Sequence, residues 1–185
     1  MNTTVAPAID LKGEWTIDNS HSNLQFTVSH LVISHVNGHF DSYDGSIENS
    51  GEDLTSAKIN FSIDAASINT GMEMRDNHLK SDDFFNAEAF PQIKFKSAEI
   101  VKTGENAYDI NGEMTVRDIT RPATFKGKIG GVAIDGYGNT KLGMKVTTTI
   151  NRFDYGLKWN QLTEVGGMTV GKEVEVNANL QFAKK

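Results

Sequence analysis

Apolar and polar residues alternate along most of the chain, with the period of two that places every second side chain of a β-strand on the same face. The alternation is clearest in residues 24–28, 57–63, 93–95, 108–116, 125–129, 142–150 and 174–182. Short segments rich in Gly, Asn, Asp and Ser separate these runs, and such residues favour hairpin turns. The pattern predicts eight or nine strands, each with one apolar face.

A sheet with one apolar face must pack on a second sheet or close on itself. Long consecutive strands joined by hairpin-length turns favour an up-and-down antiparallel barrel. We therefore expect an all-β fold in which residues 13–185 form a single domain, an antiparallel eight-stranded barrel, after a flexible N-terminal tail of residues 1–12. The interior of such a barrel is filled by side chains or holds one small ligand.

One segment, residues 70–91, interrupts the alternation and has helical features. Thr70 and Glu73 have the spacing of a capping box, in which each side chain bonds the backbone N–H of the other residue. Pro91 ends any helix. We expect a helical insertion around residues 71–86. Its apolar residues Phe84, Phe85 and Phe90 need a buried surface, and we expect them to cover one end of an apolar cavity.

Large apolar side chains on the inward face of the predicted barrel, together with the cover, are the candidate ligand-binding residues. A filled core is the alternative for these positions, and in that case the protein acts only through its surface. Apolar cavities with a few polar groups are typical binding sites for lipid-like molecules. The predicted lining and cover are Phe26, Phe40, Phe61, Phe84, Phe85, Phe95, Tyr108, Met114, Phe125, Met144, Trp159 and Phe182.

The densest polar cluster, Arg75, Asp76 and His78, lies in the helical insertion. It forms either a polar rim that meets a ligand head group or a set of structural anchors that hold the helix by charge-assisted hydrogen bonds. We favour the structural anchors. Two charged turns, one with Arg117, Asp118 and Arg121 and the other with Arg152 and Asp154, are candidates for local ion pairs of small energetic value.

Catalysis is the competing hypothesis. A small hydrolase or isomerase acting on an amphiphile would use His21, His30 or His78 as general base, within hydrogen-bond reach of the reacting group inside the cavity. The chain has no G-x-S-x-G and no P-loop, and its histidine spacings match no zinc signature. We therefore expect no catalytic residues, no metal site and no cofactor.

Charge and composition exclude further classes. The net charge of −6 argues against a nucleic-acid surface, which is normally basic. Cysteine is absent, which excludes disulfides and thiolate chemistry. No run approaches the roughly 20 apolar residues of a membrane span. The N-terminal residues lack the pattern of a signal peptide, so we expect a cytoplasmic protein as the sequence stands, or a periplasmic one if a leader has been removed.

Several motifs resemble the YceI-like family, in the same order and over nearly the whole of residues 13–182. The most specific is Arg75-Asp76-x-His78-Leu79 followed by Asp83-Phe84-Phe85. Others are Trp15-Thr-Ile-Asp18, Gly38-x-Phe40 with Gly45, Gly112-x-Met114-Thr-Val-Arg117 and Arg152-x-Asp154-Tyr155-Gly156. The chain departs from the family at Arg117-Asp118, where a glycine is common.

The resemblance implies a lipocalin-like barrel with an elongated hydrophobic pore. It also implies a role without covalent chemistry, namely the binding, carriage or sequestration of a polyisoprenoid, an isoprenoid quinone or a fatty-acid derivative. The expected partner is thus a long-chain, lipid-like small molecule, and members of the family often pair as homodimers.

Overall fold

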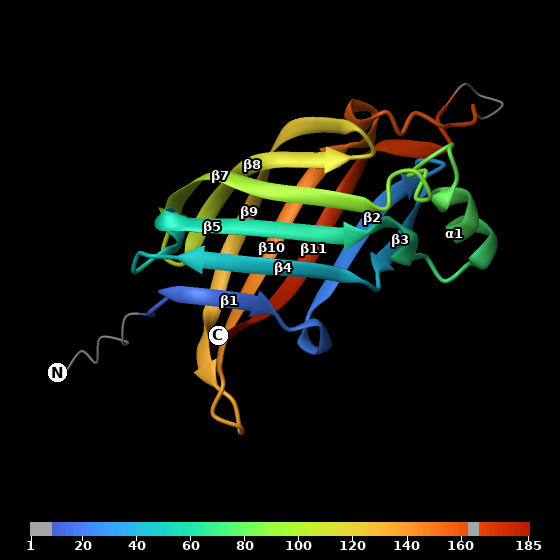
Figure 1. Ribbon diagram of the computed structural model, residues 1–185. Coiled ribbons are helices and arrows are strands. Elements are labelled where there is room, and N and C mark those ends of the chain that lie inside the picture. The colour runs from blue at the N-terminus through green and yellow to red at the C-terminus, as the bar shows by residue number, and fades with distance from the viewer. Residues whose placement is uncertain (1–8, 163–166) are drawn as a thin grey trace.

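Consecutive strands pair antiparallel along the chain and the last returns to the first, so the sheet closes into an eight-stranded barrel with one short helix (Figure 1). The computed structural model describes residues 9–162 and 167–185. The elements are β1 (Gly13–Ile17), β2 (Asn23–His30), β3 (Ser34–Phe40), β4 (Tyr43–Asn49), β5 (Ala57–Asp64), β6 (Ile68–Asn69), α1 (Glu73–Lys80), β7 (Gln92–Gly104), β8 (Ala107–Val116), β9 (Ile119–Ile134), β10 (Thr140–Asn151) and β11 (Val170–Lys184).

Kinks divide three of the eight strands, which is why the labels run to β11. A 3-10 segment, Asn19–His21, separates β1 from β2, and another, Ala65–Ser67, separates β5 from β6. A two-residue bend separates β3 from β4. Strand β11 pairs with β10 on one side and with both β1 and β2 on the other, which closes the ring. The predicted up-and-down antiparallel barrel is confirmed.

The apolar residues of the alternating sequence pattern are the ones whose side chains are buried in the barrel. In β8, for example, Tyr108, Ile110, Gly112 and Met114 are buried, while Asp109, Asn111 and Glu113, which alternate with them, are more exposed. The most completely buried large side chains gather where β1 meets its neighbours. Trp15 lies opposite Ile47 on β4, and Phe182 lies opposite both Ile17 and Leu142. We call this end of the barrel the closed end.

Part of the segment expected to be a tail packs against the closed end. Leu11 is buried, and its carbonyl oxygen accepts hydrogen bonds from Trp15 Nε1 at 3.1 Å and Asn49 Nδ2 at 3.0 Å. The ordered domain therefore includes residues that precede β1. Residues 1–8 of the expected tail lie outside the described part of the chain.

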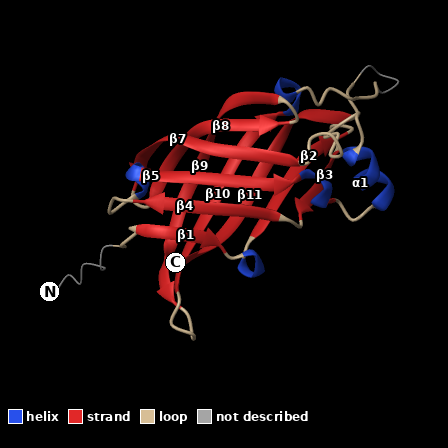
Figure 2. Cartoon of the chain, in the orientation of Figure 1, coloured by secondary structure: helices blue, strands red, loops and turns tan. Residues whose placement is uncertain are grey.

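The helical insertion leaves the sheet between β6 and β7, and α1 lies at the end of the molecule away from the labelled N and C termini (Figures 1 and 2). The helix is confirmed, but its predicted capping box is wrong: Met72 is the N-cap and has no side-chain capping bond. Gly71, at φ +76°, turns the backbone before the helix begins. Thr70 instead donates its N–H and its hydroxyl to Asp76 Oδ1, at 2.8 and 2.6 Å.

Asp18 stabilises the kink between β1 and β2. Its carboxylate accepts hydrogen bonds from Lys141 Nζ at 2.8 Å and Gln181 Nε2 at 3.1 Å, which join the kink to β10 and β11. It also lies 3.1 Å from His21 Nδ1. These partners, Lys141 first, lower the pKa of Asp18 from 3.8 to about 2. The carboxylate is therefore a stabilising anion at neutral pH.

Replacing Asp18 by asparagine is expected to lower the free energy of unfolding at pH 7 by about 2 kcal/mol. Because the pKa of the folded state lies below that of the unfolded state, this contribution is present above pH 3.8 and is lost as the pH falls toward about 2. Urea denaturation of both proteins across this range measures the difference. Asp118→Asn, at an exposed turn, is the control. A difference that stayed constant from pH 7 to pH 2 would contradict the assignment.

Candidate ligand cavity

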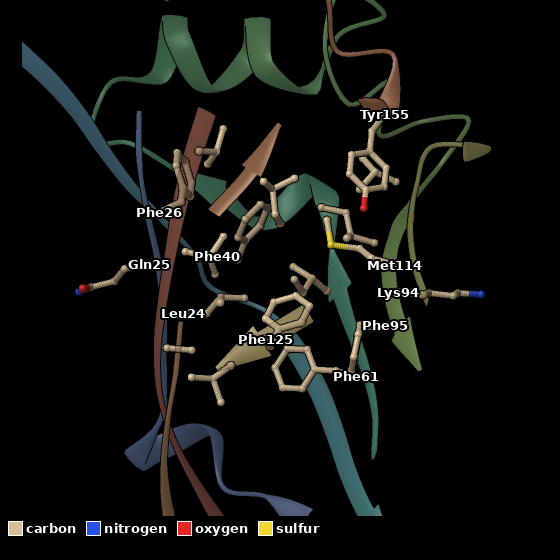
Figure 3. Close-up of a pocket in the computed structure, with 18 of the residues that line it drawn as sticks. Leu24, Gln25, Phe26, Phe40, Phe61, Lys94, Phe95, Met114, Phe125 and Tyr155 are labelled. Atoms are coloured by element: carbon tan, nitrogen blue, oxygen red, sulfur yellow. The ribbon is translucent and has the colours of Figure 1, made fainter. Parts of the chain in front are cut away.

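An apolar cavity of about 210 Å³ lies inside the barrel (Figure 3). Strands β2 to β11 all contribute side chains to its wall, as do the segment after α1 and the segment after β10. The accessible surface of the wall is apolar. Gln25 and Lys94 are consistent with this, because their polar ends point away from the cavity in Figure 3. The apolar lining suits a hydrocarbon chain.

Most of the side chains predicted as lining or cover lie in this wall, although contact with a ligand stays a prediction. Strand residues supply the sides, and the segment after α1 supplies two rings at one end. The predicted residues found in the wall are Phe26, Phe40, Phe61, Phe84, Phe85, Phe95, Met114, Phe125, Met144 and Phe182.

Two predicted lining residues lie elsewhere. Tyr108 is buried, but it belongs to the packed core and not to the cavity wall. Trp159 packs on the side of Phe84, with 5.3 Å between ring centroids, and Phe84 is the residue that lines the cavity. Trp159 is therefore a support behind the cover. Phe90, expected in the cover, instead lies beneath the guanidinium of Arg117.

Three glycines let aromatic rings lie close against the wall. Phe26 is opposite Gly38 on the neighbouring strand, and Phe61 is opposite Gly45. A Cβ atom added at Gly38 would overlap the Phe26 ring, and one at Gly45 would come within 2.7 Å of the Phe61 ring. At Gly112 a Cβ atom would come within 2.8 Å of the Phe95 ring, but it would first overlap the Lys96 carbonyl oxygen. Because glycine has no side chain, the rings can lie close to the sheet at these positions, which leaves space in the middle of the barrel.

The predicted polar anchors act mainly within the insertion. Arg75 donates to the hydroxyl and the carbonyl oxygen of Thr70, at 2.7 and 2.9 Å, so it joins Asp76 in holding α1 to the residue after β6. His78 Nε2 lies 2.8 Å from Asp83 Oδ2, and its ring packs edge-on against Phe84 and Trp159. None of these three residues lines the cavity.

The link from the cover to the barrel comes from Arg117, which the sequence did not identify as an anchor. From the β8–β9 turn it donates to the carbonyl oxygens of Asp82 and Phe84, both at 3.3 Å, and pairs with the Asp82 carboxylate at 3.2 Å. Arg117 has φ +55°, in the region that favours glycine. Arg117 thus combines a left-handed backbone with a side chain that bonds the Phe84 carbonyl oxygen.

Arg152 is a buried cation beside the cavity. Only 4% of it is exposed, and it donates to the carbonyl oxygens of Leu157, Trp159, Val170 and Gly171. Burial lowers its pKa. The expected local ion pair with Asp154 does not form, because the guanidinium points inward. Within residues 9–162 and 167–185, no carboxylate lies within ion-pair distance of it.

The cavity wall also contains many aliphatic residues, whereas the predicted lining consists mainly of aromatic ones. Several, such as Ile63, Val146 and Val176, lie on the alternating faces of predicted strands, so the period of two already contained the signal. Tyr155 and Leu157 also line the cavity. They lie in and after a 3-10 segment, Arg152–Tyr155, within a stretch that the sequence left without a regular element.

The histidines proposed for catalysis are not in the cavity wall. His21 is in the 3-10 segment between β1 and β2 and contacts Asp18. His30 ends β2, and His78 contacts Asp83 on the outer side of the cover. Over the described residues, no cluster of three or more His, Cys, Asp or Glu side chains is arranged to hold a metal ion. The same part of the chain contains no helix with the length and apolar character needed to cross a bilayer.

Comparisons with known proteins agree with this architecture. Residues 15–182 match the model of the YceI-like domain. A UPF0312 protein of Staphylococcus aureus strain N315 is 38% identical over 170 residues, covering 91% of this chain and 96% of the relative. A Campylobacter jejuni YCEI protein superposes with a TM-score of 0.73 at 28% identity, covering 85% and 90% of the two chains.

A further solved structure shares the fold at low sequence identity. It is a polyisoprenoid-binding domain from Saccharophagus degradans, implicated in plant cell wall breakdown. It superposes with a TM-score of 0.71 at 16% identity, covering 92% of this chain and 98% of that domain. At this identity the likeness concerns the fold alone.

Proposed function

Because the chain belongs to the YceI-like domain family, we propose that it binds a long-chain amphiphile in the barrel cavity and carries or sequesters it without chemical conversion. The candidate ligands are a polyisoprenoid, an isoprenoid quinone or a fatty-acid derivative. The observation that carries the proposal is the apolar wall, which encloses about 210 Å³ and in which aromatic rings lie close to glycines of neighbouring strands. A polyisoprenoid-binding domain shares this fold, so a ligand of this class is compatible with such a barrel.

Burial of the chain is the proposed source of affinity. Each buried methylene contributes about 0.8 kcal/mol, so roughly ten carbons contribute about 8 kcal/mol before the costs of association. A wall without polar surface makes few directional contacts, so it selects for hydrophobicity and width more than for a particular chain length. The polar head of the ligand would remain toward the end covered by Phe84 and Phe85.

The catalytic alternative has no support from the position of the histidines. A general base must reach the reacting group within hydrogen-bond distance, and none of His21, His30 and His78 lines the cavity. His21 contacts Asp18 at the kink between β1 and β2, and His78 contacts Asp83 in the segment that covers the cavity. A structural role is sufficient to explain both contacts.

Native mass spectrometry of protein purified from its own host, followed by organic-solvent extraction, tests the proposal. We expect a bound species with the mass of a long-chain amphiphile, which the extraction releases. The same spectra report whether the protein is a homodimer. Thermal shift with farnesol, geranylgeraniol and oleic acid is the complementary measurement. If no lipid is extracted and none of these probes raises the melting temperature, the proposal is wrong.

Variants in the helical insertion are expected to differ in their effects on probe binding and on stability. Phe84→Ala/Phe85→Ala is expected to weaken probe binding by about tenfold or more, because two rings leave the cavity wall. Arg75→Ala is expected to lower stability by about 1 kcal/mol, with little effect on affinity, because its bonds go to Thr70. Titration of a fluorescent fatty acid and thermal denaturation separate the two effects.

Phe90→Ala is the control for the double variant, since it removes a ring of the same segment that does not line the cavity. If Arg75→Ala weakened binding more than the double variant did, the assignment of binding and anchoring residues would have to be reversed.

A further inference from the structure

The β2–β3 turn holds aliphatic side chains in solvent on an unfavourable backbone. Val32 is 82% exposed and Ile33 is 85% exposed, and Leu31 is also exposed. Leu31 and Val32, the central residues of the turn, have φ of +53° and +65°, and the Ile33 N–H donates to the His30 carbonyl oxygen at 3.3 Å. A turn with two positive φ values favours Asn-Gly, and a β-branched residue there is an outlier. Neither packing nor local backbone preference accounts for this sequence.

The turn lies at the same end of the barrel as the cover of the cavity. Its preceding residue, His30, pairs with Val170, which lines the cavity, and the Leu31 N–H donates to the Thr169 carbonyl oxygen at 2.8 Å. Helix α1 is at this end as well, away from the labelled termini in Figure 1. It adds two exposed methionines, Met72, its N-cap, and Met74.

We propose that Leu31, Val32, Ile33, Met72 and Met74, named here the apolar rim, dock on the surface of a neutral lipid bilayer, from which the cavity exchanges its ligand. The exchange rests on the proposed function, whereas the docking is a separate property of the rim. When the rim is docked, a hydrocarbon chain that passes between bilayer and cavity crosses less water than it would if the protein were free in solution. Aliphatic side chains at a protruding tip can enter the boundary between head groups and acyl chains.

A protein partner fits the rim less well. A stable interface buries about 800 Å² on each partner, which is more than a turn tip and two methionines supply. Binding hot spots are enriched in Trp, Tyr and Arg, whereas Leu and Val are under-represented in them. The rim contains none of the favoured types. The net charge of −6 opposes attraction to anionic lipid, which is why the proposal specifies a neutral bilayer.

Flotation with phosphatidylcholine vesicles tests the docking. The wild-type protein is expected to float with the vesicles, and Val32→Ser/Ile33→Ser is expected to reduce the bound fraction by about tenfold. The control is Ile134→Ser/Tyr137→Ser, which removes two exposed apolar side chains at a different part of the barrel. Ile134 is the last residue of β9, and Tyr137 lies in the turn between β9 and β10. The control is expected to float as the wild type does.

A second variant separates docking from misfolding. Leu31→Asn/Val32→Gly installs the residues that this turn prefers, so it is expected to raise the melting temperature while it reduces flotation. Damage to the fold would lower both. Neither variant removes a residue of the cavity wall, so binding of oleic acid added from solvent is expected to be unchanged.

Three results would overturn the docking: no flotation of the wild type, equal losses in the rim and control variants, or concentration-dependent self-association that the rim variants abolish. The last would identify a second copy of the chain as the occupant. If the rim variants fail to float while neither wild type nor variant binds any long-chain probe, the docking stands and the proposed function fails.

Discussion

Arg152→Leu is expected to lower the free energy of unfolding by about 4 kcal/mol. The guanidinium donates to four carbonyl oxygens that come from two separate segments, Leu157 and Trp159 after β10 and Val170 and Gly171 at the start of β11. Leucine is shorter than arginine and has no hydrogen-bond donor, so these acceptors are left without donors. Each buried carbonyl that loses its partner costs about 1–3 kcal/mol, less where water can reach it.

Urea denaturation at pH 7 measures this loss. Arg121→Leu is the matched control, because Arg121 is exposed and donates one long bond, 3.4 Å, to the Asp154 carbonyl oxygen. Arg152→Lys should fall between the two, since an ammonium has three donors in place of five and a different geometry. A loss below about 1 kcal/mol for Arg152→Leu would mean that the carbonyls find other partners and that the cation is not the organising group.

Gly38→Ala is expected to weaken binding of long-chain probes by about tenfold or more while it costs about 1–3 kcal/mol of stability. The new methyl group would occupy the space of the Phe26 ring, so the ring must turn away from β3. The Phe40 ring, with its centroid 5.7 Å away, limits the directions that remain. The displaced ring enters a cavity of about 210 Å³, where it takes the place of ligand.

A double variant distinguishes this mechanism from general damage to the sheet. Gly38→Ala/Phe26→Leu removes the ring that the methyl group displaces, so affinity is expected to recover toward the wild-type value. Gly136→Ala is the control, because nothing lies within 4 Å of a Cβ added there. Isothermal titration with oleic acid gives the affinities. If a folded Gly38→Ala protein bound the probe with unchanged affinity, the Phe26 ring would not be displaced into the cavity and the mechanism would be wrong.

The alternation of apolar and polar residues predicted the strands, because burial on one face of a strand is a local property of the sequence, and the short turns between long strands favoured the barrel. The kinks were harder to foresee. Asp18, for example, acts at a kink through Lys141 and Gln181, which are far away along the chain. The capping box failed for a similar reason, because Gly71 delays the helix and Asp76 reaches back to Thr70.

The cavity was predictable in outline and not in detail. Periodicity indicates which side chains point inward, but not which rings lie close to a glycine of the next strand, because that depends on register. Arg117 and Arg152 looked like surface residues in charged turns. Their roles depend on carbonyl oxygens that only the folded chain brings near them. The compartment, the homodimer and the identity of the ligand stay predictions.

Closure of the ring has a consequence for how the protein is made. Strand β11 pairs with β1 and β2, so the contact that completes the barrel joins residues at opposite ends of the domain. During synthesis β1 and β2 emerge from the ribosome long before their partner β11 has been made. Proteins dominated by such distant pairings fold slowly, and their unpaired strand edges are open to aggregation in the meantime. Because β11 is the strand that closes the barrel, we expect the early strand edges to stay unpaired until the end of synthesis.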